Sequence, residues 1–139
     1  MLSLGPINIL DESGVCFEVS VTQPFDAGDD LVFQLESGFG LLRVLAVEQH
    51  EGDTVWHLLA YEELFPDVET AEAALAQPHT IHPRIRHMAL TNRAFERTPA
   101  AKLGNRAVAE DELAGYREWL DAGPGPVSDR SALLMLGLR

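Results

Sequence analysis

The sequence predicts one α+β domain: a small antiparallel curved sheet or barrel, followed by a short helix, an extended basic arm and an amphipathic helix. Three observations lead to this fold class. Short apolar segments alternate with turns over residues 13–62, an apolar stripe with helical spacing lies at 109–122, and 139 residues are enough to bury one hydrophobic core. We expect residues 1–139 to form a single domain, in which 63–123 hold the helices and the arm and 124–139 form an apolar tail.

Four segments have the apolar pattern of β-strands. In the first, Val15–Thr22, apolar and polar side chains alternate with the period of two that marks a half-buried strand. The other three lie at residues 31–35, 41–48 and 54–61 and are separated by turns that contain glycine or aspartate. Gly38 and Gly40 flank one of these turns, where a positive φ or a close approach of the backbone costs glycine little. Consecutive strands at this spacing favour an antiparallel meander.

A helix and an extended segment are expected after the sheet. Asp67 can cap a helix over residues 68–76, because its carboxylate can accept hydrogen bonds from the free backbone N–H groups of the first turn. Residues 81–90 are expected to be extended, since Pro83 is not tolerated inside a helix and the side chains around it alternate.

The strongest helical pattern lies near the C-terminus. Residues 109–122 are expected to form a helix that ends at Gly123-Pro124, and its apolar stripe consists of Leu113, Tyr116 and Leu120. Residues 128–138 fit either a short helix, capped by Ser128 or Asp129, or a closing strand, and periodicity does not decide between the two.

Charge is distributed unevenly along the chain. Residues 1–80 contain fifteen acidic side chains and one basic one, Arg43, whereas residues 81–139 contain nine basic and seven acidic ones. The net charge is −12, which argues against nucleic acid or a membrane surface as a partner, since both attract lysine and arginine. A basic protein is the partner that an acidic surface favours.

The basic arm, residues 84–106, has one acidic residue, Glu96, and six cations, which are Arg84, Arg86, Arg93, Arg97, Lys102 and Arg106. The arm either packs across the acidic sheet module or forms a separate recognition surface, and we favour internal packing. Phe95 is expected to anchor the arm through apolar contacts.

No pattern in the sequence indicates catalysis. His79, His82 and His87 invite a metal-site hypothesis, but one H-x₂-H pair followed by a proline, without a thiolate ligand, is not a zinc pattern. Adjacent carboxylates on a strand point to opposite faces, and the glycine segment matches neither a nucleophile nor a phosphate-binding motif. We therefore predict no catalytic residue, no metal ligand and no cofactor.

The sequence also indicates a cytoplasmic protein. The N-terminus lacks the charged and apolar regions of a signal peptide, and no apolar run approaches the roughly 20 residues of a membrane span. Cys16 is the only cysteine, so no intrachain disulfide is possible, and its apolar neighbours favour a buried thiol. The pattern does not indicate an oligomeric state.

The spacing of glycines and charged residues in residues 26–62 resembles that of a known family. Gly28-Asp29-Asp30-x-Val32, followed by Gly38-x-Gly40-x-x-Arg43-Val44-Leu45, resembles the opening hairpin of immunity proteins from bacterial polymorphic-toxin systems. The resemblance implies an SH3-like barrel and a cytoplasmic inhibitor that occludes a basic surface of a toxin.

Six acidic residues near turns are the candidate partner-binding residues: Asp29, Asp30, Glu51, Asp53, Glu62 and Glu63. Their charge would steer a basic protein toward the surface before apolar docking. One alternative is a small-molecule-binding regulatory protein, in which Phe39, Trp56 and Tyr61 line the mouth of the barrel. Further alternatives are a metal-dependent hydrolase that uses the histidine segment and an acidic mimic of nucleic acid.

Overall fold

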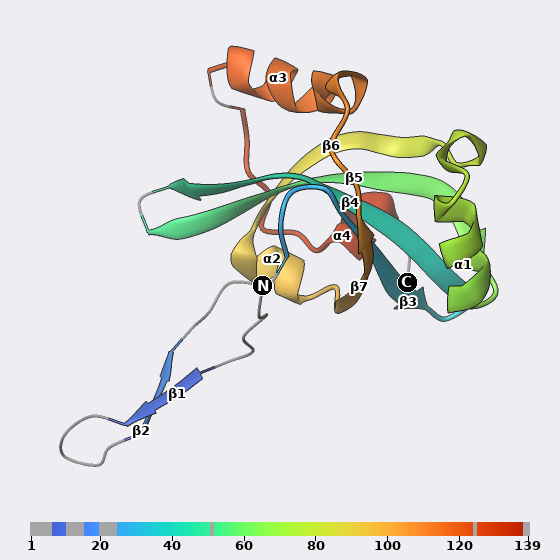
Figure 1. Ribbon diagram of the computed structural model, residues 1–139. Coiled ribbons are helices and arrows are strands. Elements are labelled where there is room, and N and C mark those ends of the chain that lie inside the picture. The colour runs from blue at the N-terminus through green and yellow to red at the C-terminus, as the bar shows by residue number, and fades with distance from the viewer. Residues whose placement is uncertain (1–6, 11–15, 20–24, 51, 124, 138–139) are drawn as a thin grey trace.

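The computed structural model describes residues 7–10, 16–19, 25–50, 52–123 and 125–137 (Figure 1). Most of these residues belong to a five-stranded antiparallel sheet with the strand order β6-β5-β4-β3-β7. Its strands are β3 (Asp29–Leu35), β4 (Gly38–His50), β5 (Asp53–Phe65), β6 (Pro83–Thr91) and β7 (Ala100–Asn105). A separate two-stranded sheet pairs β1 (Ile7–Leu10) with β2 (Cys16–Val19).

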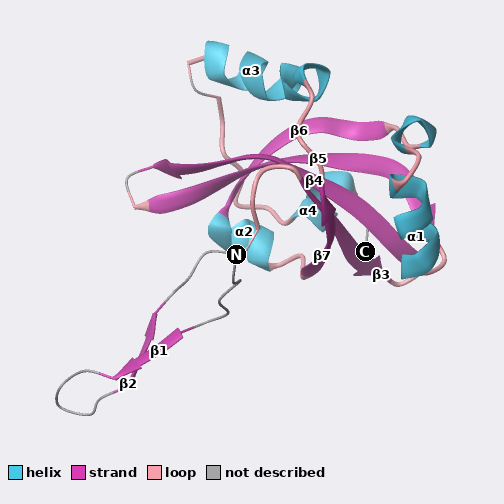
Figure 2. Cartoon of the chain, viewed as in Figure 1, coloured by secondary structure: helices cyan, strands magenta, loops and turns pink. Residues whose placement is uncertain are grey.

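Short helices lie on both faces of the large sheet (Figure 2). The α-helices are α1 (Val68–Leu75), α2 (Asn92–Glu96), α3 (Ala114–Asp121) and α4 (Ala132–Leu136), and two 3₁₀ turns are η1 (Pro78–Thr80) and η2 (Glu110–Leu113). The α+β class is therefore confirmed. Among the described residues, no helix is long and apolar enough to cross a membrane.

The sheet is an open meander with one crossover. Strands β3, β4, β5 and β6 each pair with the next in the chain, and β7 then returns to pair with β3 at the far edge. The strand order ends on β6 and β7, so the described strands form an open sheet and not a closed barrel. The first predicted strand, Val15–Thr22, is described only over Cys16–Val19, and it pairs with β1 rather than joining the meander.

Two hydrophobic cores lie on opposite faces of the sheet. The first core packs against α2 and α4, and its largest side chain, Trp56, has its ring centroid 4.8 Å from that of Phe95. Phe95 is 1% exposed, so its predicted role as the apolar anchor of the basic arm is confirmed. The second core packs against α1, where Leu59 and Tyr61 of the sheet contact the helix around Ala71.

The β3–β4 turn shows both roles that were expected of its glycines. Glu36 and Ser37 form the turn itself, and Gly38 follows with φ at 152°, a value that an L side chain rarely adopts. Gly40 has no positive φ, but a Cβ there would lie 2.4 Å from Cζ of Phe33. Gly38 therefore allows a backbone conformation with positive φ, and Gly40 leaves room for the ring of Phe33 in the core.

The helix predictions are confirmed in position and corrected in detail. Asp67 caps α1 and accepts from the backbone N–H of Thr70 at 2.7 Å. The helix expected at 109–122 is divided into η2 and α3. The C-terminal segment, left open between helix and strand, is the helix α4, and its cap is Ser131 rather than Ser128 or Asp129.

The segment after Pro83 is extended as predicted, but the arm that follows is not extended throughout. β6 runs to Thr91, whose side chain then accepts from the backbone N–H of Ala94 at 3.1 Å and begins α2. The short helix α2 therefore interrupts the arm before β7, and it turns Phe95 toward the first core.

Replacing Gly40 with alanine should destabilise the fold, because the added Cβ would overlap the ring of Phe33, which is 3% exposed and has little room to move. Overpacking of this kind costs about 1–3 kcal/mol. Urea unfolding followed by circular dichroism should show a lower midpoint with an unchanged slope. Gly104→Ala is the matched control, because an added Cβ there meets no atom within 4 Å. Equal midpoints for the two variants would contradict the packing.

Candidate functional site

The sheet face that packs against α1 also carries polar side chains along its length. Arg43 lies between Leu41 and Leu45 of the second core and opposite Leu59 of β5. His57 precedes Leu59 by two positions, so it lies on the same face. This face therefore holds two polar groups, one around Arg43 and one around His57.

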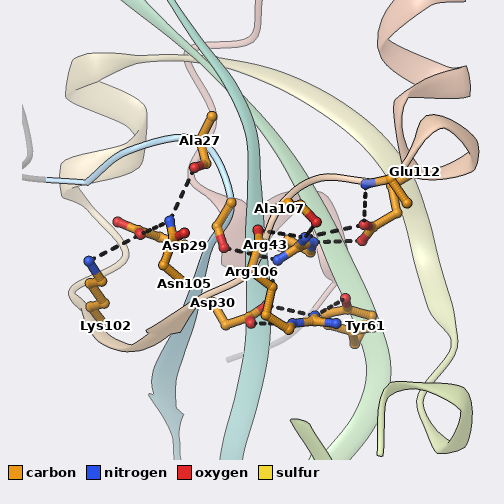
Figure 3. A network of polar contacts seen from close by, with 12 residues as sticks. Ala27, Asp29, Asp30, Arg43, Tyr61, Lys102, Asn105, Arg106, Ala107 and Glu112 are labelled. Carbon is orange, nitrogen blue, oxygen red and sulfur yellow. Dashed lines mark hydrogen bonds and ion pairs between the residues drawn. The ribbon is translucent and has the colours of Figure 1, made fainter. Parts of the chain in front are cut away.

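Arg43 is fully buried, and every N–H of its guanidinium group has an acceptor (Figure 3). Nη1 donates to the backbone oxygen of Gly28 at 3.0 Å and to Oδ1 of Asp30 at 3.2 Å. Nε donates to Oε2 of Glu112 at 2.6 Å, and Nη2 to Oε1 at 3.2 Å. Nη2 also donates to two backbone oxygens, those of Arg106 and Ala107.

Asp30 is shared between two guanidinium groups. The carboxylate is 2% exposed, and Arg106 also binds it, with Nε donating to Oδ2 at 2.7 Å and Nη2 at 3.0 Å to Oδ1, the oxygen that Arg43 also contacts. Nη2 of Arg106 also lies 3.4 Å from the hydroxyl of Tyr61. Bonding to Asp30 raises the pKa of Arg106, and burial raises the pKa of Tyr61 against the opposing effect of Arg106. Arg106 therefore stays charged and Tyr61 stays protonated at neutral pH.

Asp29 is bound by a second set of partners on the neighbouring strand. It is fully buried, and its Oδ1 accepts from Nδ2 of Asn105 at 2.8 Å and lies 3.2 Å from Nζ of Lys102. Its Oδ2 accepts from the backbone N–H of Asp26 at 2.8 Å. Both members of the Asp29-Asp30 pair therefore attach β3 to the segment that contains β7.

The basic arm packs against the acidic sheet module through two of its cations. Lys102 and Arg106 pair with Asp29 and Asp30, so the favoured internal reading is confirmed for these two residues. Of the remaining four, Arg93 and Arg97 bond to the side chain and the backbone of Asp129. The last two, Arg84 and Arg86, are exposed.

The second polar group is a histidine cluster of Glu48, His57, His87, Tyr116 and Trp119. His57 is fully buried, and its Nδ1 lies 2.8 Å from Nε2 of His87. Its Nε2 lies 2.6 Å from Oε1 of Glu48. The N–H···O angle departs too far from linear for a hydrogen bond, so this contact is a close polar approach. The hydroxyl of Tyr116 donates to the same oxygen at 3.0 Å. The rings of Tyr116 and Trp119 lie against His57, with centroid distances of 4.4 and 4.7 Å.

The environment keeps both imidazoles neutral at pH 7. Burial lowers the pKa of His57, and this effect outweighs the neighbouring Glu48, which raises the pKa. Burial and the nearby His57 lower the pKa of His87 to about 4, again against the effect of Glu48. Because Glu48 favours a proton on Nε2 of His57, we assign the Nδ1 of His57 as acceptor and the Nε2 of His87 as donor. A chain of three groups therefore runs from Glu48 through His57 to His87.

The geometry of this chain does not fit one metal ion. Glu48 and His87 approach opposite ring nitrogens of His57, so a single ion cannot contact all three side chains. In the described part of the chain, no three His, Cys, Asp or Glu side chains gather as metal ligands. The histidines of the hydrolase alternative are also separated: His79 is exposed in η1, and His82 bonds to Glu63 at 2.6 Å.

The structure separates the six candidate partner-binding residues. Asp29 and Asp30 are buried and paired, so their carboxylates do not face a partner. Asp53 and Glu62 are exposed, and Glu63 is partly buried beside His82. The sixth residue, Glu51, lies outside the described residues.

The three candidate ligand-lining residues do not share a pocket. Trp56 belongs to the first core, where its Nε1 donates to Oδ1 of Asn92 at 3.0 Å. Phe39 and Tyr61 belong to the second core, on the opposite face of the sheet. The open sheet also has no barrel mouth among its described strands, so this grouping was wrong in geometry.

His57 and Glu48 were not among the candidate residues predicted from the sequence. The available signal was the position of His57 in an apolar strand, in alternation with Leu59 and Tyr61, which places a polar ring on a core face. Glu48 gave no such signal, because a register shift between Val44 and Ala46 changes the face to which the end of β4 points.

We compared the chain with protein-family models, with curated proteins and with solved structures, and none of the three comparisons found a match. Inference of function therefore depends on the charge, burial and contacts of the described side chains.

Replacing Arg43 with methionine should strongly destabilise the protein. The change removes the donor that Arg43 supplies to Asp30, to Glu112 and to the backbone oxygens of residues 28, 106 and 107, and breaking a buried ion network of this kind costs about 3–5 kcal/mol. The control is Arg93→Met, which removes a cation whose side chain is 71% exposed. Urea unfolding should show a large loss for the first variant and little change for the second. Equal stability of Arg43→Met and the wild type would refute the role of this network.

Proposed function

We propose that this protein is a non-catalytic binding module that presents exposed carboxylates at the end of β5 and on α1 to a basic protein. These carboxylates, here together called the acidic patch, belong to Glu62 on β5 and to Asp67, Glu69 and Glu72 at the start of α1 and within it. All four side chains are exposed. Within the described part of the chain, none of them forms an ion pair, and this observation carries the proposal.

The contrast with the buried acids supports this assignment. Asp29 and Asp30 are neutralised by Arg43, Lys102 and Arg106, so their charge contributes little to the outer field. Among the described residues the four carboxylates of the acidic patch have no such ion-pair partner, and residues 44–83 contain no lysine or arginine. Carboxylates that keep their charge toward solvent can raise the association rate of a basic partner by about 10–10³-fold at low salt.

An exposed apolar side chain next to Glu62 supplies the contact that follows steering. Leu64 is 44% exposed and lies two positions after Glu62, on the same side of β5. An apolar contact at the centre of charged neighbours is a common arrangement at protein interfaces.

The resemblance to immunity proteins supplies a class of partner for this proposal. On that reading the protein binds and occludes a basic surface of a bacterial toxin in the cytoplasm. The open sheet departs from the barrel that the resemblance implies. The proposed binding surface therefore depends on the acidic patch, and the toxin is one candidate for the basic partner.

The test uses three baits: the wild type, Glu62→Gln/Glu69→Gln/Glu72→Gln, and the control Asp111→Asn/Glu118→Gln/Asp121→Asn. Asp67 is left unchanged because it caps α1. Both triple variants remove the same charge, and the control residues are exposed. Proteins captured from lysate are eluted in a salt series and identified by mass spectrometry.

We expect one basic protein to be retained by the wild type and the control and to be lost from the first variant. Its association rate, measured by surface plasmon resonance, should fall about tenfold or more for that variant and should depend less on salt. Equal capture by all three baits would show that binding does not use the acidic patch. Absence of any enriched protein under gentle washing would sink the binding-module proposal.

A further inference from the structure

We propose that the His57–His87 pair is an acid-sensitive latch that holds α3 against the sheet. In the closed form the two rings share a hydrogen bond beneath α3, and protonation of both rings releases the helix. This device is independent of the proposed partner binding, because it uses other residues and another part of the sheet.

Helix α3 is attached by few side chains. None of its residues is buried, so its position depends on contacts with the histidine cluster. Tyr116 and Trp119 lie against the ring of His57, and the hydroxyl of Tyr116 donates to Glu48. Gly115 lies so close to His87 that a Cβ there would be 2.8 Å from the Cβ of His87. A helix held by so few contacts opens at a low free-energy cost.

The chain is attached to the sheet both before and after α3. Release of the helix is therefore a local opening. Before the helix, Glu112 of η2 bonds to the buried Arg43 at 2.6 Å. After it, the backbone of Ser128 donates to Ala89 at 2.8 Å and accepts from Thr91 at 3.0 Å, along the edge of β6. Residues 114–123 can therefore leave the sheet while β6 and β4 stay in place. Figure 1 shows α3 lying alongside β6, outside the sheet.

The hydrogen bond between the rings requires one acceptor nitrogen. In the neutral pair, Nδ1 of His57 accepts from Nε2 of His87 over 2.8 Å. A first added proton leaves one acceptor, so the bond survives, although the charge lies in a buried site. A second proton places two N–H groups face to face at this distance, and the pair can no longer form the bond. The pair therefore titrates as a unit. When both rings are protonated, two charges lie beneath Tyr116 and Trp119, and the open form, in which water reaches the rings, is favoured.

The other groups around the pair determine the sign of the acid effect. Glu48 of β4 and Tyr116 of α3 are the titratable side chains in contact with it, and Glu48 favours protonation of both rings. Nearby charged side chains on β6 and α3 are exposed: Arg86, Arg117 and Glu118. Because burial outweighs Glu48 and both pKa values are lowered, the closed form binds fewer protons than the open form. Closure is therefore favoured above about pH 6.5 and weakens as the pH falls toward 4.

Backbone amide exchange of the full chain, read by mass spectrometry at pH 7 and about pH 4.5 and corrected for intrinsic rates, tests the latch. At the lower pH the opening equilibrium of residues 114–122 should rise on the order of tenfold, since opening returns the pKa of His87 from about 4 toward 6.5 and its partial exposure reduces the full effect. Residues 29–35 of β3 should keep their protection. Simultaneous loss of protection in β3 would mean global unfolding and would overturn a local latch.

Two variants should move the acid response in opposite directions. His87→Gln keeps a neutral donor in reach of His57 and should reduce the ratio of opening between the two pH values by severalfold. Glu48→Gln removes the anion that stabilises the protonated rings in the closed form, so this ratio should increase. His82→Gln is the matched control, because it removes an exposed histidine of the same segment whose partner is Glu63.

The outcomes separate the latch from a general effect of acid. The proposal holds if His87→Gln weakens the response, Glu48→Gln strengthens it and His82→Gln leaves it unchanged. It fails if residues 114–122 exchange equally at the two pH values in the wild type. It also fails if all three variants respond as the wild type does. Should His87→Gln not fold, the opposite prediction for Glu48→Gln and the wild-type titration still decide the question.

Discussion

The pairing of a buried Arg43 with a buried Asp30 is the interaction on which the rest of the structure depends. A charge inside a protein costs several kcal/mol unless a partner and further hydrogen bonds compensate it. Arg43 obtains that compensation from Glu112 and from backbone oxygens at residues 28, 106 and 107. These groups come from the β3–β4 hairpin and from the segment after β7, so the network can form only when both are in place. The fold of the sheet edge and the position of η2 are therefore one energetic unit.

Most of the secondary structure could be predicted from the sequence, because it follows from local rules. The alternation of side chains, the cap at Asp67 and the stop after residue 122 depend on neighbours within a few positions. Whether the sheet closes into a barrel could not be predicted in this way, because it depends on pairing between strands that are far apart in the sequence. β7 pairs with β3 and leaves β6 as the other edge, and no local pattern carries this information. Helix α2 was missed because only five residues form it, although Thr91 gives it a cap.

The candidate site was harder to predict for a physical reason. The charge map left open whether the basic arm packs internally or forms a recognition surface, and the ion pairs of Lys102 and Arg106 confirm the internal packing that we favoured. It did not distinguish buried from exposed carboxylates, since Asp29 and Asp30 occur in a turn-like sequence but lie beneath cations supplied from residues 102 and 106. The histidine cluster combines β4, β5, β6 and α3. Register shifts in two strand pairs decide which side chains meet there, and these shifts have no sequence signature that we recognise.

The long interval between β3 and β7 has a consequence for the growing chain. Asp29 lies opposite Asn105 in the sheet, whereas β3, β4 and β5 are joined by short turns. Distant pairings form late because closing a long loop costs more chain entropy. At roughly 5–20 residues per second, translation needs on the order of ten seconds to proceed from Arg43 to Arg106. During that time Asp29, Asp30 and Arg43 lack the partners supplied by residues 102 and 106, and water must solvate their charges. The emergence of Lys102 and Arg106 from the ribosome then allows these charges to enter the interior, so completion of the sheet is timed by the synthesis of its last strand.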